Sequence, residues 1–306
     1  MKVISPWIHT TELCNLRCKY CYVRGNAIMQ KPVYSAMKSF LLNEQFEHIH
    51  LRFAGGEPLL VFKEWEEFAK QMLIDERVSV EILTNFREVP SEFWSFSEHN
   101  KVNVSVSIDG SGDKPLNREI SNKLKRLKDP WILTTVTPDN INHLDLLAAF
   151  IGKNNYGWAL TTDYFQKQQV PEDELLIKLI ELLNTLKEFN YDFNKLTFNN
   201  CTIKHNFSGC KAGTEMIAID CDGNIYQCQT LIGNKNKIIG NVFKGFKQTP
   251  IVKFGCQNCD IHKLICYGWC PLYHRANNFL CEIMKIFSIK LFECYKEVEN
   301  AKRLSM

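Results

Sequence analysis

The stretch Cys14-Asn15-Leu16-Arg17-Cys18-Lys19-Tyr20-Cys21 directly follows the run Val3–Thr11, whose Val, Ile and Thr content predicts a β-strand. Three thiolates at spacings of four and three residues cannot complete the four-coordinate shell of a zinc ion by themselves. They can bind three irons of a [4Fe–4S] cluster and leave one iron without a protein ligand. A zinc site completed by a distant residue remains the alternative.

Cysteine is unevenly distributed along the 306 residues. Of the thirteen cysteines, three lie in this loop, none in the next 179 residues, and ten between positions 201 and 294. No secretory signal opens the chain, which predicts a cytoplasmic protein whose clustered cysteines bind metal rather than form disulfides. The net charge of +3 and the short apolar runs give no reason to expect nucleic-acid binding or a membrane span.

Up to about residue 190, β-rich runs alternate with helical stretches. The predicted strands are Val3–Thr11, His48–Ala54, Ser79–Thr84, Val102–Ile108, Trp131–Thr137 and Gly157–Tyr164. The predicted helices are Val33–Glu47, Leu60–Glu76, Ser91–Asn100, Leu116–Lys128, Asn142–Asn154 and Glu172–Asn190, with a closing helix Leu280–Leu304. Six β–α units in a row predict an α/β fold with a parallel sheet and crossover helices. In such folds the chemistry lies in the loops after the C-terminal ends of the strands.

A second motif, Gly55-Gly56-Glu57-Pro58, follows the second predicted strand. Paired glycines allow the backbone to approach a ligand closely, and Glu57 supplies a carboxylate that can accept hydrogen bonds from an ammonium group. A Gly-Gly pair alone is usually a turn, but this one lies one crossover away from the cysteine loop.

CxxxCxxC after a first strand, with an aromatic before the third cysteine, followed by GGEP after a second strand, resembles the radical S-adenosylmethionine (SAM) superfamily. The resemblance covers roughly residues 3–165 and implies a partial (β/α)6 barrel, which we expect over residues 1–195. It implies that Cys14, Cys18 and Cys21 bind a [4Fe–4S] cluster whose open iron chelates SAM. By the same resemblance Gly55, Gly56 and Glu57 accept the SAM amino group, Pro58 shapes the turn, and the backbone around Tyr20 lies near the adenine.

Two more strand ends resemble the family's SAM contacts. Leu83-Thr84-Asn85-Phe86 is similar to its Thr-Asn-Gly turn, with Phe86 in place of the usual glycine, and Asn85 is expected to reach SAM. Ser105-Val106-Ser107-Ile108-Asp109-Gly110 resembles the segment whose serine, here Ser107, contacts SAM. Arg118 and Arg126 are both candidates for binding the SAM carboxylate.

Seven of the ten cysteines after position 200 follow a recognisable order of spacings in a loop-rich setting. They are Cys210, Cys228, Cys256, Cys259, Cys266, Cys270 and Cys281. Two zinc sites need eight ligands, so seven thiolates leave zinc one short. The order of spacings is very similar to the SPASM domain of radical SAM enzymes, which we expect as a small α+β domain over residues 196–306.

The SPASM resemblance implies two auxiliary [4Fe–4S] clusters, three clusters in all. Cys210, Cys228 and Cys270 share the first, and Cys256, Cys259, Cys266 and Cys281 bind the second. The first set lacks a fourth ligand, because Met216 stands where some relatives have a cysteine. Cys221 is favoured as the fourth ligand over Cys201, an open iron is the other alternative, and Cys294 is expected to be a buried thiol.

SPASM-type relatives mostly modify peptides, which implies a peptide substrate. Carbon–carbon or thioether crosslinking is ranked first, because it needs no hydrogen donor from the protein. Epimerisation would need a thiol, Cys201 or Cys221, and formylglycine formation would need a base, for which Asp220 or Asp222 are candidates. Small-molecule oxidation, or a non-enzymatic iron–sulfur or zinc protein, complete the alternatives.

The chain begins its first predicted strand at once, so we expect a separate leader-binding protein as a partner or direct peptide binding by the barrel. A flavodoxin- or ferredoxin-type protein is the expected reductant.

Overall fold

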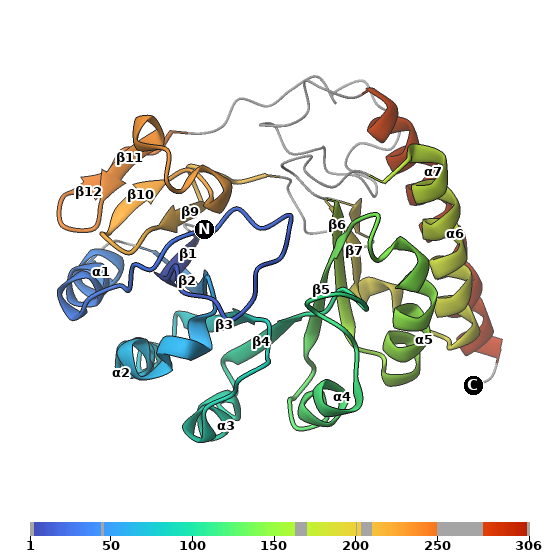
Figure 1. Cartoon of the computed structure of the whole chain (residues 1–306), viewed down its shortest axis with the longest axis horizontal. Helices are drawn as coiled ribbons and strands as arrows, with labels where there is room; N and C mark the ends of the chain where they lie inside the picture. The colour runs from blue at the N-terminus through green and yellow to red at the C-terminus, as the bar shows by residue number, and fades with distance from the viewer. Residues whose placement is uncertain are drawn as a thin grey trace. The chain divides into compact units, whose positions relative to one another are not determined.

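A computed structural model describes residues 3–43, 46–162, 170–199, 201–202, 210–249 and 278–304 (Figure 1). These residues form two compact units. The first comprises Met1–Val106, Asn122–Lys128 and Lys211–Ile251, and the second comprises Ser107–Ser121, Asp129–Cys210 and Val252–Met306. The predicted domain boundary between residues 195 and 196 remains a prediction.

Parallel strands form the sheet of the first unit. They are β1 (Val3–Thr11), β2 (His48–Gly55), β3 (Val78–Thr84) and β4 (Val102–Ser107), each paired with the next along the chain. Helices α1 (Lys31–Asn43), α2 (Phe62–Leu73) and α3 (Ser91–Ser97) connect them and cover one face of the sheet (Figure 1). A 3₁₀ turn, η1 (Pro58–Val61), leads into α2.

Alternating residues of the strands pack against these helices. On β2, Ile49, Leu51 and Phe53 are buried, and the Phe53 ring stacks on Trp65 of α2 with centroids 4.3 Å apart. Since successive side chains of a strand point to opposite faces, His50 and Arg52 lie on the face away from the helices. One face is therefore an aromatic and aliphatic core, and the other carries polar side chains.

An antiparallel region extends the sheet of this unit. Strand β9 (Met216–Ile219) pairs in parallel with β1, so a segment more than 200 residues later in the chain lies beside the first strand. Strands β10 (Asn224–Tyr226), β11 (Ile238–Asn241) and β12 (Gly245–Phe246) follow in antiparallel order, with 3₁₀ turns η4 (Gln229–Leu231) and η5 (Lys235–Lys237) between β10 and β11.

The second unit contains strands β5 (Trp131–Val136), β6 (Gly157–Thr162) and β7 (Leu196–Phe198), which pair in parallel, and β8 (Cys201–Thr202), which is antiparallel to β7. Its helices are α5 (Leu144–Asn154), α6 (Glu172–Glu188) and α7 (Asn278–Leu304), and α6 packs against the other two. Turns η2 (Ile141–His143) and η3 (Phe193–Lys195) and the short helix α4 (Arg118–Leu124), which spans the division between the units, complete the elements.

The predicted α/β fold is confirmed, with a parallel sheet of the radical SAM type and an antiparallel region after it. Every predicted strand and helix is present, with ends shifted by a few residues. The predicted helix Leu60–Glu76 opens as η1, because Pro58 starts the turn and Glu57 caps it. Residues 163–164 of the sixth predicted strand lie outside the described residues.

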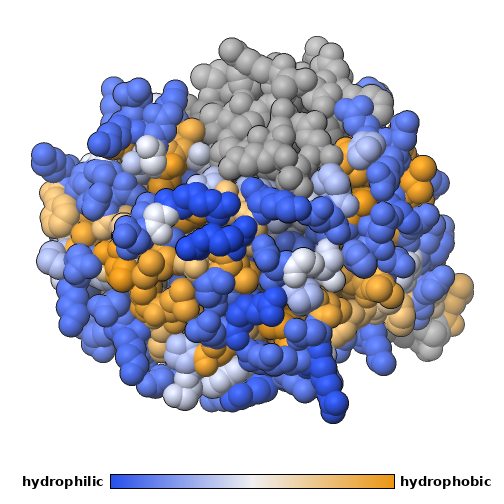
Figure 2. All heavy atoms as spheres, in the orientation of Figure 1, coloured by the Kyte–Doolittle hydropathy of each residue, from blue (hydrophilic) through white to orange (hydrophobic). Residues whose placement is uncertain are grey.

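Among the described helices, none combines the length and the apolar character that crossing a membrane needs. On the face shown in Figure 2, hydrophilic side chains are interspersed with apolar ones.

Candidate functional site

The Gly55–Glu57 loop lies directly against the start of the cysteine loop. The Gly56 amide donates to the Thr11 carbonyl at 2.7 Å, and the Glu57 amide donates to the Leu13 carbonyl at 2.7 Å. Gly55 has φ +122°, and a Cβ on either glycine would overlap the Thr11 or Leu13 carbonyl. Glycine at both positions is therefore what allows the ends of β1 and β2 to dock backbone to backbone.

The Glu57 carboxylate is almost fully buried, at 1% exposure. Its Oε1 accepts from the Thr84 hydroxyl at 2.6 Å and from the Leu59 amide at 3.0 Å, and its Oε2 accepts from the Asn85 amide at 2.7 Å. A buried carboxylate is stable only when such donors replace water. Glu57 thus links the end of β2 to the end of β3.

The turn after Glu57 is held from the helix side as well. Pro58 occupies the first turn of η1, where a missing amide proton costs nothing, and its carbonyl accepts from the Trp65 indole at 2.9 Å. Trp65 is completely buried against Phe53 and Phe62. The position of this loop therefore depends on the aromatic core beneath it.

Asn85 connects the end of β3 to the cysteine loop. Its Nδ2 donates to Asn15 Oδ1 at 2.8 Å and lies 3.8 Å from Cys14 Sγ. The Leu16 amide also donates to Cys14 Sγ, at 3.4 Å. Hydrogen bonds to a cluster thiolate are among the factors that set an iron–sulfur potential, so these donors suit Cys14 to that role.

The other two thiols of the loop are shielded to different degrees. Cys18 is buried, Cys21 and Tyr20 are half-buried, and the Cys21 amide donates to the Cys18 carbonyl at 3.1 Å. Arg24 donates to the same carbonyl at 2.9 Å. Within the described part of the chain, no three His, Cys, Asp or Glu side chains are arranged around a single metal ion. The three thiols on one loop, with donors to Cys14 and two docked glycines beside them, fit an iron–sulfur cluster ligand set.

Phe86 adopts the left-handed conformation, φ 59°, that the glycine of the family's turn would adopt without strain. Its side chain is fully buried and contacts Phe93 and Trp94 edge-on. Burial of an aromatic ring offsets a backbone cost of about 1–3 kcal/mol. The departure from glycine therefore leaves the turn in place and adds core packing.

His9 is a buried side chain of this region that the sequence reasoning missed. It lies near the end of β1 at 2% exposure, and desolvation lowers its pKa to about 4. Its ring lies 6.2 Å from that of Tyr22, just beyond the cysteine loop. The imidazole is therefore neutral at physiological pH.

Cys221 and Cys228 lie at opposite ends of the β9–β10 hairpin. Ile225 pairs with Ile219 and Tyr226 with Ala218, so Cys221 lies in the turn, and Cys228 follows two residues after the other end of β10. The five residues from Cys221 to Tyr226 span about 16 Å at the usual rise of a strand. The Cys221 thiol donates to the His9 carbonyl at 3.2 Å, and burial raises its pKa to about 12. This register disfavours Cys221 as a partner of Cys228 on one cluster.

The aspartates beside Cys221 have structural surroundings. Asp220 accepts hydrogen bonds from the amides of Asp222 and Asn224, from the Asn224 side chain and from the Tyr226 hydroxyl. Asp222 is exposed at the tip of the turn. Asp220 thus shapes the hairpin.

Ser107 ends β4 and is half-buried, and Arg118 is exposed at the start of α4. Both belong to the second unit. In the first unit, Arg126 lies over the Trp94 ring at 3.5 Å. A stacked guanidinium keeps its N–H donors available, so Arg118 and Arg126 both stay predictions for the SAM carboxylate.

The remaining predicted ligands are only partly covered by the described residues. Cys210 and Cys281 are half-buried, Cys228 and Cys294 are buried, and Cys201 lies on β8. Cys256, Cys259, Cys266 and Cys270 lie outside the described residues.

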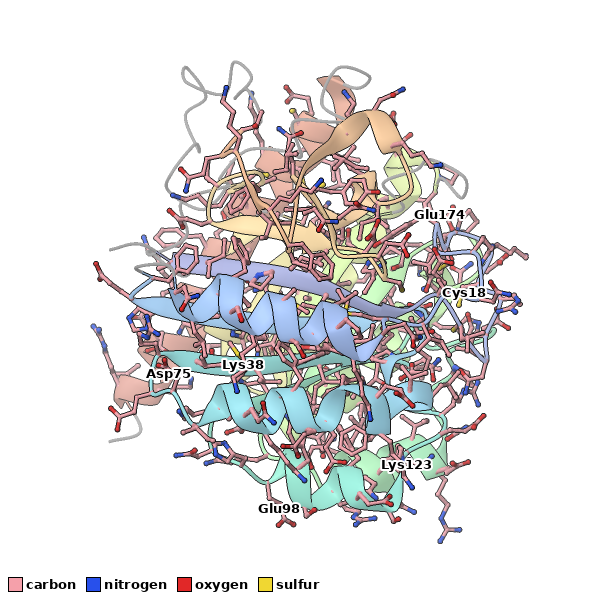
Figure 3. The ribbon with its side chains drawn as sticks, turned by 90° about the vertical axis from the view of Figure 1, so that its left-hand side faces the viewer. Cys18, Lys38, Asp75, Glu98, Lys123 and Glu174 are labelled. Atoms are coloured by element: carbon pink, nitrogen blue, oxygen red, sulfur yellow. The ribbon has the colours of Figure 1, made fainter. Side chains whose placement is uncertain are left out.

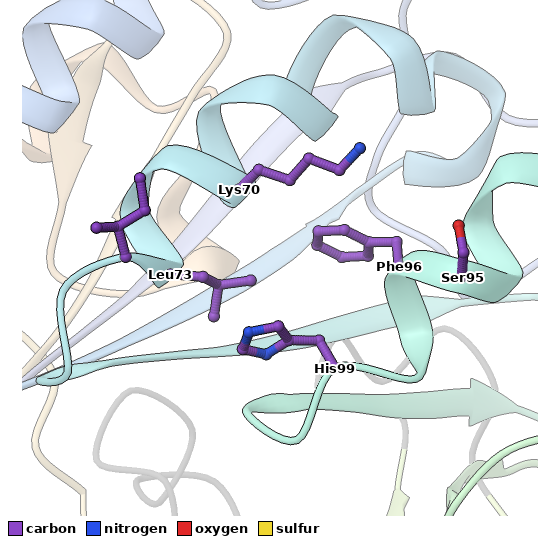
Figure 4. A pocket seen from close by; sticks show the side chains of 6 residues that line it. Lys70, Leu73, Ser95, Phe96 and His99 are labelled. Carbon is purple, nitrogen blue, oxygen red and sulfur yellow. The ribbon is translucent and has the colours of Figure 1, made fainter.

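A surface pocket of about 280 Å³ lies between α2 and α3 (Figure 4). Lys70, Leu73, Ile74, Ser95, Phe96 and His99 line it. The pocket-lining residue Ile74 directly precedes Asp75 in the chain. Figure 3 shows Asp75 and Cys18 at opposite ends of the strands. Sites in parallel α/β sheets form at the C-terminal ends of the strands, where Cys18 lies, so this pocket is separate from the cysteine loop.

The fold and sequence resemble known radical SAM proteins over nearly the whole chain, although no protein-family model matches it. The cysteine-type anaerobic sulfatase-maturating enzyme of Clostridium novyi (strain NT) is 24% identical over 94% of this chain and 95% of its own length. The structure of native anSMEcpe with bound AdoMet matches with a TM-score of 0.75 at 18% identity, covering 97% of this chain and 100% of that one. Streptococcus suis SuiB bound to S-adenosylmethionine matches with a TM-score of 0.64 at 16% identity, covering 88% and 71%.

The chain is thus related in sequence and similar in fold to radical SAM enzymes of the SPASM type. The relatives that match over most of their length are enzymes, which disfavours the alternative of a non-enzymatic metal protein. SAM and [4Fe–4S] clusters are the cofactors of this class of enzyme, and the residue assignments made from the sequence remain predictions.

We predict that Glu57→Gln destabilises the protein by about 2–3 kcal/mol. Glutamine has only one acceptor oxygen, so its NH2 group must face a backbone N–H that has lost its acceptor. Denaturant midpoints measure the change. Glu92→Gln, on exposed α3, is the control and should stay within about 0.5 kcal/mol. Equal effects of the two substitutions would contradict the role given to Glu57.

His9 should make the stability depend on pH. Its folded-state pKa is lowered, so the unfolded chain binds a proton first as the pH falls below about 6.5, and stability is lost from there toward pH 4. Between pH 7 and pH 5 the loss from this group is about 2 kcal/mol. Unfolding curves of wild type and His9→Gln at both values test this. The variant should lose less stability on acidification, and parallel losses would refute the assignment.

Proposed function

We propose that this enzyme reductively cleaves SAM and uses the resulting radical to crosslink a ribosomally made peptide through a carbon–carbon or thioether bond. The observation that carries the proposal is the docking of the Gly55–Glu57 loop onto the start of the cysteine loop. This docking supports the proposal because it brings the three thiols and the backbone groups that we assign to SAM to the same end of the sheet.

Cys14, Cys18 and Cys21 would bind the cluster that, when present, supplies the electron for cleavage of SAM to methionine and a 5′-deoxyadenosyl radical. Because the Glu57 carboxylate already accepts three hydrogen bonds, its role is to fix the loop, and the backbone carbonyls beside it receive the SAM ammonium. Tyr20, Asn85, Ser107 and Arg118 are the further SAM contacts proposed.

The auxiliary clusters are assigned as the SPASM resemblance implies. Cys210, Cys228 and Cys270 would bind the first, and Cys256, Cys259, Cys266 and Cys281 the second, for three clusters in all. Cys221 is left out of the first set, because it lies in the turn of the hairpin and Cys228 follows the other end of β10.

The surroundings of Cys221 and the aspartates favour crosslinking over its alternatives. A hydrogen donor for epimerisation must reach the substrate, but Cys221 is buried and bonded to the His9 carbonyl. A base for formylglycine formation must be available; Asp220 is engaged within the hairpin, and only the exposed Asp222 remains as a candidate for that role. Crosslinking needs neither group. Formylglycine formation is the second candidate, because relatives matched over most of their length are sulfatase-maturating enzymes.

A peptide substrate is supported by the solved relatives, since anSMEcpe binds a peptide and SuiB binds its precursor peptide in their structures. A flavodoxin- or ferredoxin-type reductant and a separate leader-binding protein are the partners proposed.

Anaerobic incubation of the reconstituted enzyme with SAM, dithionite and the short peptides encoded beside its gene tests the function. We expect 5′-deoxyadenosine and a peptide that has lost two hydrogens, found by mass spectrometry, and that a carbonyl reagent does not label. Labelling by that reagent would favour formylglycine. Absence of 5′-deoxyadenosine would refute radical SAM chemistry.

Substitution of the two hairpin cysteines separates their roles. Cys228→Ala should lower the iron content of the purified enzyme by up to one cluster, about four irons. Cys221→Ala should leave the iron content unchanged, because its thiol lies at the far end of the hairpin. Iron analysis and the visible absorption of anaerobically purified protein measure both. Iron loss in Cys221→Ala equal to that in Cys228→Ala would show that Cys221 is a ligand.

A further inference from the structure

A row of large polar side chains crosses the sheet of the first unit on the face away from its helices. Trp7 of β1 pairs with Arg52 of β2, and Arg52 pairs with Glu81 of β3. Their neighbours Ile8, Phe53 and Ile82 are fully buried on the helix side. Because strand residues alternate between faces, the three polar residues are side by side.

Glu81 holds Arg52 in place. Its Oε2 lies 3.0 Å from Arg52 Nε and 3.3 Å from His50 Nε2, and its Oε1 accepts from the Ser105 hydroxyl at 2.6 Å. Although desolvation raises the pKa of Glu81, the His50 hydrogen bond and the Arg52 charge lower it to about 2 overall. The carboxylate is therefore ionised, and both of its oxygens are already engaged.

The donors on the other side of this row are not engaged. The Trp7 indole nitrogen is buried without a hydrogen-bond partner, as is the Ser5 hydroxyl two residues earlier. The Arg52 guanidinium lies over the Trp7 ring at 5.2 Å. Arg52 Nε pairs with Glu81 by charge at 3.0 Å but is also buried without a hydrogen bond, and among the described residues no hydrogen bond or ion pair involves the two terminal nitrogens of Arg52.

Unpaired buried donors are costly, about 1–3 kcal/mol each, so a group of them on one face indicates a ligand that supplies acceptors. The side chains of Arg52 and Glu81 retain 30% and 20% exposure, which leaves this face open to a ligand. The row lies three residues before Gly55 on β2, about 10 Å along the strand. It is therefore within the span of a substrate that also reaches the SAM loop.

We propose that Arg52 and Trp7 bind a carboxylate of the substrate. The inference rests on the proposed function in taking that substrate to be a peptide, whose carboxylate is either an acidic side chain or the C-terminus. The two terminal nitrogens of Arg52 donate to the two oxygens of the carboxylate, and the Trp7 indole N–H donates to one of these oxygens. Glu81, with His50 and Ser105, fixes the guanidinium so that little conformational entropy is lost on binding.

Ligand-observed NMR on the reconstituted holoenzyme tests the site with small probes. N-acetylglutamate methylamide carries only a side-chain carboxylate, N-acetylleucine carries only a C-terminal one, and N-acetylglutamine methylamide and N-acetylleucine amide are their neutral counterparts. We expect at least one acid to bind at least tenfold more tightly than its neutral counterpart. The acid that binds identifies the source of the carboxylate.

The variants assign the binding to this row. Arg52→Lys keeps the charge but loses the fork and should weaken binding of that acid at least tenfold. Trp7→Phe keeps the ring but loses the N–H and should weaken it about threefold. Lys63→Gln, which removes one positive charge from the exposed outer face of α2, should bind the acid as the wild type does.

Equal binding of acids and neutral probes, no binding to wild type, or full binding to both Arg52→Lys and Trp7→Phe would overturn the proposal. If Arg52→Lys does not fold, Trp7→Phe alone decides. A wild-type enzyme that forms 5′-deoxyadenosine but does not bind either acid would refute this site and leave the proposed radical chemistry intact.

Discussion

The buried carboxylate of Glu57 is the interaction on which the candidate site depends. The carboxylate accepts hydrogen bonds from Thr84 and Asn85 at the end of β3 and from the Leu59 amide in the turn after β2. The backbone amide of Glu57 donates to the Leu13 carbonyl at the start of the cysteine loop. Three stretches that are far apart in the sequence thus meet at one charged group. Since a buried charge is tolerated only with its donors in place, the three stretches are positioned together or not at all.

The aromatic core supports this arrangement from the helix side. Trp65 donates to the Pro58 carbonyl and stacks on Phe53, and Phe86 packs on Phe93 while holding a conformation that is costly for a bulky residue. The stability of the core thereby fixes the loops that carry the chemistry. The opposite face of the same strands is free to carry polar groups, and Arg52 and Glu81 occupy it.

Local patterns were sufficient to predict the elements and the motifs. The alternation of β-rich and helical runs gave the strands and helices, and the cysteine spacing with Gly55-Gly56-Glu57 indicated the site. Contacts that depend on how the strands pair could not be predicted from local sequence patterns. Cys221 is close to Cys228 in sequence but at the other end of a hairpin, and Trp7, Arg52 and Glu81 become neighbours only when three strands align. Burial of His9 likewise depends on packing, not on any motif.

In our proposal the cysteine loop binds a cluster, and SAM, held by the loop that Glu57 anchors, coordinates to that cluster. Electron paramagnetic resonance of the reduced enzyme, before and after addition of SAM, tests it most directly. We expect SAM to change the g values of one reduced cluster and Cys18→Ala to abolish this change. A spectrum that SAM leaves unaltered in the wild type, or a change that persists in Cys18→Ala, would contradict it.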